Sequence, residues 1–111
     1  MVKAIILFRS GTQTLEYGER YNNFLMSLET LPGLRKKAVN TVYAGPGGLA
    51  PYRAVIEIYF DDRPSLEAAL TSPEGVRSGH MLLDFAGPDA ITLFADVMEE
   101  AYDTQSPAAE S

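Results

Sequence analysis

The chain has 111 residues, enough for one domain that buries about two thirds of its unfolded surface. Its net charge of −6 offers no basic surface for nucleic acid or an anionic membrane. The chain has no cysteine, which excludes disulfides, thiolate catalysis and cysteine-ligated metals. No apolar run approaches the roughly 20 residues that span a bilayer, and no signal segment precedes the first predicted strand. We therefore expect a soluble, cytoplasmic protein.

The first half of the sequence predicts a strand, a helix and a second strand. Residues 2–9 begin with an apolar run typical of a strand that is buried on both faces. A helix should follow, with Thr14 as its N-cap and Pro32-Gly33 at its end. Its apolar residues recur at helical spacing and are Tyr17, Tyr21, Phe24, Leu28 and Leu31. Residues 34–44 are more polar, as an edge strand should be.

The second half predicts a strand, a broken helix and a last strand. Residues 54–60 form another run that is apolar on both faces. Asp62 and Ser72 both have the character of N-caps, so the helical region should divide into residues 64–71 and 73–84. The last strand is predicted over residues 90–98, where Ile91, Leu93, Ala95 and Val97 alternate with Thr92, Phe94, Asp96 and Met98. The domain should cover residues 1–100, followed by a disordered tail over residues 101–111.

The element order β-α-β-β-α-β predicts an α+β fold, the ferredoxin-like split βαβ arrangement. In that fold the antiparallel sheet has four strands in the order 4-1-3-2, so strands one and three are central. These are the two strands with apolar residues on both faces. A chain of this length has too few helices to cover both faces of the sheet. A second copy of the protein should therefore cover the bare face, which predicts a homodimer.

Several segments, in this order, resemble the EthD family, which is named for ethyl tert-butyl ether degradation. They are Leu31-Pro32-Gly33-Leu34-Arg35, residues 52–61, Ser72-Pro73-Glu74-Gly75 and Phe85-Ala86-Gly87-Pro88. The resemblance implies a dimeric α+β barrel, in which two four-stranded sheets pack face to face and ligands lie between the sheet and the helices of one protomer. Relatives in this superfamily include muconolactone isomerases, quinol monooxygenases, polyketide cyclases and haem-binding chlorite dismutases. The family commonly has a histidine near the end of helix one, where this sequence has Phe24.

Two residues are candidates for acid–base catalysis. His80 is the only histidine, and it shares a helix face with Val76 and Leu83 that would turn toward the sheet. The alternative is an exposed or hydrogen-bonded structural histidine. Glu57 lies in the middle of a central strand, where a carboxylate needs a partner or a raised pKa. It is either an acid or base in a pocket, or half of a structural pair with Arg, Lys or Tyr on a neighbouring strand.

Four aromatic residues are candidate ligand contacts, namely Tyr17, Tyr21, Phe24 and Tyr59. The two tyrosines of helix one would otherwise belong to the core. One histidine falls short of the usual three or four metal ligands, so we expect no metal and no cofactor. A haem group would need His80 as its proximal ligand.

Two functions stay open at this point. The first is a small-molecule-binding protein that acts as a cofactor-independent enzyme on an apolar or phenolic metabolite, of the isomerase, cyclase, dehydratase or monooxygenase type. In that interpretation His80 shuttles a proton and Glu57 assists. The second is a non-catalytic binding or accessory protein of a degradation or biosynthesis pathway, and the absence of the histidine that the family commonly has near the end of helix one agrees with it.

Overall fold

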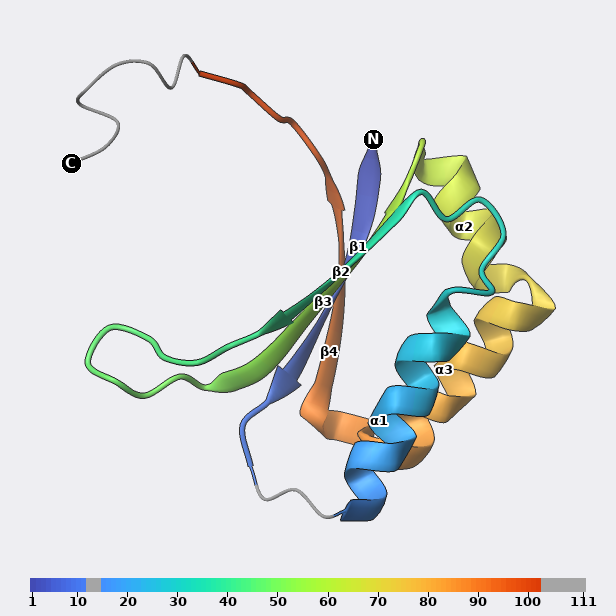
Figure 1. The fold of residues 1–111 in the computed structure, drawn as a ribbon. Coiled ribbons are helices and arrows are strands. Elements are labelled where there is room, and N and C mark those ends of the chain that lie inside the picture. The colour runs from blue at the N-terminus through green and yellow to red at the C-terminus, as the bar shows by residue number, and fades with distance from the viewer. Residues whose placement is uncertain (12–14, 103–111) are drawn as a thin grey trace.

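A computed structural model describes residues 1–11 and 15–102 of the chain (Figure 1). Its elements are β1 (Val2–Arg9), α1 (Leu15–Leu28), β2 (Lys36–Thr41), β3 (Tyr52–Phe60), α2 (Arg63–Thr71), α3 (Pro73–Phe85), the 3-10 turn η1 (Gly87–Asp89) and β4 (Ala90–Asp96). The predicted N-cap Thr14 and the tail from Asp103 onward lie outside the described residues.

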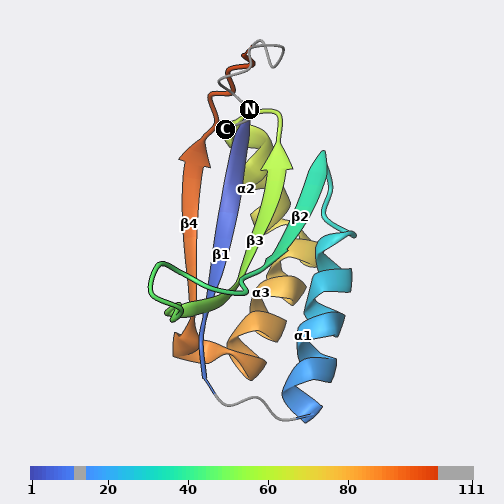
Figure 2. The same cartoon turned by 60° about the vertical axis from the view of Figure 1, so that its left-hand side comes forward.

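The four strands form one antiparallel sheet in the order β2-β3-β1-β4, which confirms the predicted topology (Figure 2). The edge strands are shorter than their sequences predicted. β2 pairs with β3 only from Lys36 to Thr41, and β4 ends at Asp96. β4 has no partner beyond that point because β1 begins at Val2, and the last contact is the Val97 N–H donating to the Met1 carbonyl at 2.9 Å.

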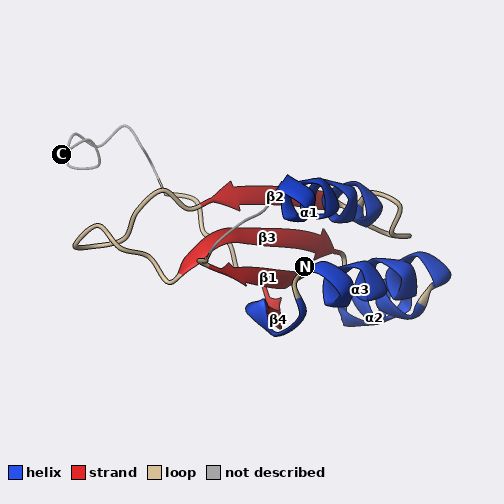
Figure 3. Cartoon of the chain, turned by 90° about the horizontal axis from the view of Figure 1, so that it is seen from below, coloured by secondary structure: helices blue, strands red, loops and turns tan. Residues whose placement is uncertain are grey.

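All three α-helices lie on one face of the sheet (Figures 1 and 3). α1 lies beside β2, where the Lys37 ammonium donates to the Leu25 carbonyl at 3.1 Å and pairs with Glu29 at 2.8 Å. α2 and α3 lie beside β1 and β4. The core between the layers contains Val2, Ala4, Ile6, Phe8, Ala54, Ile56, Ile58 and Phe60 from the sheet, with Phe24, Leu28 and Leu66 from the helices.

The other face of the sheet, here called the open face, is covered by no helix in the part of the chain that the structure describes. Strand alternation and register assign to it Lys3, Ile5, Leu7, Val55, Glu57, Tyr59, Ile91, Leu93 and Ala95. Most of these side chains are apolar and only partly buried. β1 and β3 are therefore central strands with apolar residues on both faces, as their sequences predicted.

The helical region after β3 is broken at Ser72, as predicted from its two N-caps. The Asp62 carboxylate accepts from the Ser65 N–H at 2.8 Å, and the Ser72 hydroxyl accepts from the Gly75 N–H at 3.1 Å. Gly75 is buried against the last turn of α2, and a Cβ atom there would lie 2.1 Å from the Ala69 carbonyl oxygen. The absence of a side chain at this position lets α3 begin directly against the end of α2.

Candidate functional site

Two adjoining cavities lie between the sheet and the helices α2 and α3, and they share Leu70 in their walls. The α2 cavity has a volume of about 500 Å³ and is bounded by α2, β4 and the start of β1. The α3 cavity has a volume of about 380 Å³ and is bounded by α3, α1 and the middle of the sheet. The two cavities together are here called the cleft, and each alone has the size of a small-molecule site.

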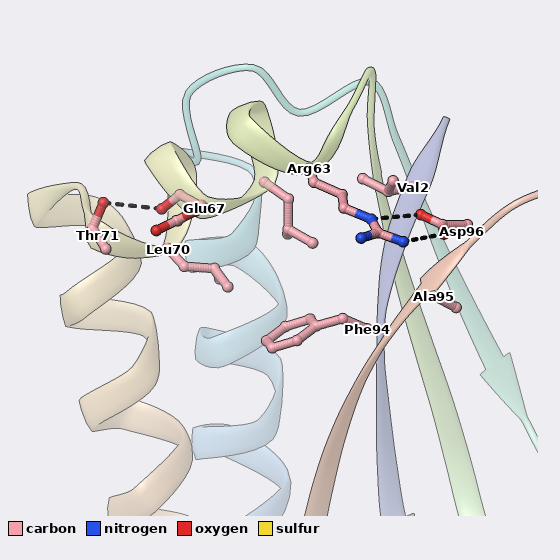
Figure 4. A pocket seen from close by; sticks show the side chains of 9 residues that line it. Val2, Arg63, Glu67, Leu70, Thr71, Phe94, Ala95 and Asp96 are labelled. Atoms are coloured by element: carbon pink, nitrogen blue, oxygen red, sulfur yellow. Dashed lines mark hydrogen bonds and ion pairs between the residues drawn. The ribbon is translucent and has the colours of Figure 1, made fainter.

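The α2 cavity has an apolar wall and a charged rim (Figure 4). Leu70 and Phe94 approach it from the helix and from the strand, and the Phe94 ring is 61% exposed. Above them, Arg63 reaches from the first turn of α2 to Asp96 at the end of β4. The Arg63 Nε donates to Asp96 Oδ1 at 3.0 Å, and Nη2 donates to Oδ2. These hydrogen bonds lower the pKa of the Asp96 carboxyl.

The α3 cavity is almost entirely apolar. Val76, His80 and Leu83 lie on one face of α3 and line the cavity, and all three are exposed. Its polar lining consists of Ser78, His80 and Thr92. Ser78 is buried and its hydroxyl is 2.8 Å from the hydroxyl of Ser27, so it is already engaged in holding α3 to α1. The polar side chains that remain available to a ligand are therefore His80, which is exposed, and Thr92 on the facing strand.

Glu57 lies on the opposite side of the sheet from His80. It projects onto the open face, where the Lys3 ammonium is 2.5 Å from Oε2 and the Asn40 amide donates to Oε1 at 3.0 Å. The Tyr59 hydroxyl lies 3.4 Å from Oε2. The structure therefore does not bring the two candidate catalytic residues together, and it gives Glu57 the structural pairing that was the alternative interpretation. The hydrogen bond from Lys3 lowers the pKa of Glu57 and raises that of Lys3.

The Lys3–Glu57 pair should make stability depend on pH. Because the folded-state pKa of Glu57 lies below its ordinary value of 4.5, its contribution is complete above that pH and is lost as the pH falls through the folded-state pKa. We expect Glu57→Gln to lower the free energy of unfolding by about 1–2 kcal/mol at neutral pH and to have no effect in strong acid. Chemical denaturation across the acid range measures this. Glu16→Gln is the control, since Glu16 is 70% exposed in its pair with Arg20; a Glu57→Gln effect that did not change with pH would contradict the prediction.

The four predicted aromatic contacts are dispersed. Phe24 lines the α3 cavity, whereas Tyr59 lies on the open face between Lys3 and Lys36. Tyr17 and Tyr21 line neither cavity of the cleft. They pack around the guanidinium of Arg53 instead, whose carbon is 4.4 Å and 5.3 Å from the two ring centroids.

Arg53 reaches these rings because β3 has one extra residue there. Phe8 is opposite Ala54 and Arg9 is opposite Tyr52, so the β1–β3 register shifts at Arg53 and the Arg53 side chain lies on the helix side. Burial raises the pKa of the neighbouring Tyr21. No signal in the sequence marks this bulge, so sequence reasoning missed Arg53.

Metal binding and membrane spanning find no support in the described residues. Residues 1–11 and 15–102 contain no group of three histidine or acidic side chains placed to hold a metal ion. Over the same residues, no helix is long and apolar enough to cross a membrane.

Solved structures show what this chain is similar to, although no protein-family model and no curated protein sequence matches it. An EthD family protein from Bacillus halodurans is 30% identical, with a TM-score of 0.84 over 88% of this chain and 99% of that protein. A dimeric ferredoxin-like protein of unknown function from Jannaschia sp. is 16% identical, with a TM-score of 0.70 over 86% of this chain and 98% of that one.

A third match is SnoaB, described as a cofactor-independent oxygenase from Streptomyces nogalater. It is 11% identical, with a TM-score of 0.66 over 92% of this chain and 97% of SnoaB. At such low identity, the Jannaschia and Streptomyces proteins show the fold alone. The Bacillus protein shows more, since the similarity in sequence and structure covers nearly its whole length. The chain therefore belongs to the EthD family and has the ferredoxin-like fold.

Proposed function

We propose that the protein binds a small apolar or aromatic molecule in the cleft between β4 and the helices α2 and α3. The observation that carries this proposal is the large apolar surface that the cleft leaves in contact with solvent. Phe94, Leu83 and Val76 line it and are 61%, 67% and 47% exposed. Side chains of this kind are normally buried, and their grouping in one concave site is typical of ligand-binding surfaces.

A second candidate function is catalysis without a cofactor in the α3 cavity. The observation that favours it is the position of His80, the only histidine, at the rim of an apolar cavity with Thr92 on the facing strand. A neutral imidazole can accept a proton from a bound phenol or activated C–H group and return it. SnoaB, which has the same fold, is described as a cofactor-independent oxygenase. Glu57 has no part in this proposal, because it is paired with Lys3 on the open face.

Replacing His80 with Asn should weaken ligand binding or abolish turnover while leaving the fold intact. His80 is exposed and contributes little to the packed core, so its loss should hardly change the melting temperature. Native mass spectrometry of the purified protein identifies any molecule that it retains, and titration with that molecule then compares wild type with the variant. Arg77→Gln, on the same helix but outside the cavity lining, is the matched control. Wild-type affinity and unchanged turnover in His80→Asn would return His80 to a structural role.

We also propose that two copies of the chain pack through their open faces. The open face is mostly apolar and no helix of the described chain covers it. A stable homodimer of this kind should bury more than about 800 Å² on each protomer. The Jannaschia relative is described as dimeric, which supports the same assembly here.

A further inference from the structure

The charged rim of the α2 cavity contains a cation that is already paired. Among the residues that the structure describes, Arg63 is the only lysine or arginine that lines either cavity of the cleft. An arginine beside an apolar pocket is normally well suited to bind a carboxylate, because its guanidinium donates two parallel hydrogen bonds. In this protein Asp96 accepts two such hydrogen bonds from Arg63, and its own carboxylate also lines the pocket (Figure 4).

The remaining charges around this rim do not favour an anion. Glu67 also lines the cavity and adds a second carboxylate. The hydrogen bonds from Arg63 are the main cause of the lowered pKa of Asp96, and the positive Met1 amino group lowers it further. The same amino group acts on Asp61 and Asp62, so its charge is shared among three carboxylates. A ligand carboxylate would therefore meet two carboxylates, Asp96 and Glu67, and an arginine whose positive charge Asp96 already neutralises. An uncharged ligand is not repelled by these carboxylates, and it buries apolar surface against Leu66, Leu70 and Phe94.

We propose that Asp96 makes the cleft selective for uncharged ligands by occupying Arg63. This inference rests on the proposed function of the cleft and adds the ligand class and the residue that determines it. Asp96 occupies the Nε and Nη2 edge of the Arg63 guanidinium and neutralises its charge, so a carboxylate ligand on the remaining Nη1 edge would gain little attraction. A ligand that instead displaced Asp96 would leave that carboxylate beside Glu67 without its cation. Asp96 is thus a specificity-determining residue, and its removal should convert the α2 cavity into a site for carboxylates.

The test uses two probes of the same shape, 1-naphthamide and 1-naphthoate, at neutral pH. Asp96→Asn is the informative variant, because an asparagine oxygen still accepts a hydrogen bond from Arg63 but no longer neutralises it. Asp61→Asn is the matched control. Asp61 forms the same bidentate pair with Arg35, at 2.9 and 2.8 Å, and has similar exposure, but neither residue lines the cleft. Both variants change the net charge equally, so their difference isolates the local effect.

In calorimetric or NMR titrations, wild type should bind the amide about tenfold more tightly than the carboxylate. Asp96→Asn should bind the carboxylate about tenfold more tightly than wild type does, with little change for the amide. Asp61→Asn should behave as wild type with both probes. Arg63→Gln should weaken the carboxylate further, and combining it with Asp96→Asn should cancel the gain.

Three results would overturn the inference. Equal affinity of wild type for the two probes would show that the rim does not discriminate charge. An equal gain in Asp96→Asn and Asp61→Asn would assign the effect to net charge rather than to Arg63. Failure of every variant to bind either probe, with unchanged melting curves, would overturn the proposed function itself and this inference with it. The first two results leave the proposed function standing, so the two failures are distinguishable.

Discussion

Replacing Ile5 with Asp should convert the proposed dimer into a monomer. Ile5 lies in the middle of the central strand β1 on the open face, between Glu57 on β3 and Leu93 on β4. In the proposed dimer, the substitution would bury a carboxylate next to Glu57, whose charge has the same sign. Because the interface is symmetric, each of the two protomers contributes one such aspartate to it. Because burying each unpaired charge costs several kcal/mol, the dissociation constant should rise by about a thousandfold or more.

Light scattering coupled to gel filtration at micromolar protein concentration measures the mass of both forms. Met26→Asp is the matched control, since Met26 is 66% exposed on α1, a helix on the other side of the sheet, and its replacement should leave the dimer intact. If wild type were itself a monomer with a normal melting curve, the dimer proposal would fail. If Ile5→Asp remained a dimer, the interface would have to lie on another surface.

Replacing Gly75 with Ala should cause a larger loss of stability than the same substitution at the helical glycines Gly18 and Gly79. The new Cβ would lie 2.1 Å from the Ala69 carbonyl oxygen and 2.7 Å from that of Leu70. Both atoms belong to the backbone of α2, so the overlap is relieved only by moving one helix away from the other. We expect a loss of about 2–4 kcal/mol in the free energy of unfolding, measured by chemical denaturation.

Gly79→Ala provides a control within the same helix. No atom lies within 4 Å of a Cβ at Gly79, so the substitution adds the same methyl group without a clash. It should stabilise the protein by about 0.5–1 kcal/mol, because alanine has the higher helix propensity. If the two variants lost similar amounts of stability, the close approach of α2 and α3 at Gly75 would not be the cause.

Local signals in the sequence predicted the elements well, because those signals act over a few residues. Asp62 and Ser72 cap the two helical pieces, and apolar runs on both faces marked the two central strands. The predicted ends of β2 and β4 lie too far along the chain. β4 ends where its partner β1 begins, at Val2, and β2 ends at the pair Thr41–Ala54, next to the bulge at Arg53. Partner lengths depend on residues far away in the sequence.

The site was harder to predict, for a reason that lies in the central strands themselves. In a strand with one wet face, the polar residues show which side points away from the core. β3 is apolar on both faces, so its sequence gave no sign that Glu57 points away from the helices while Ile56 and Ile58 point toward them. The pairing of Arg63 with Asp96 joins α2 to β4, two elements that are distant in the sequence, so no local sequence pattern predicts it.

The position of β1 in the sheet also determines the order in which the protein can fold. β1 is synthesised before the other three strands of the sheet, and both of its neighbours follow much later, with Val2 opposite Phe60 on β3 and Asp96 on β4. Such distant pairings slow folding, because long loops must close before the contacts form. Until then, the backbone hydrogen-bonding groups of residues 4–8 have no strand partner on either side. Short apolar segments of this kind aggregate readily when they are exposed. The nascent chain is therefore most vulnerable until β4 has been synthesised.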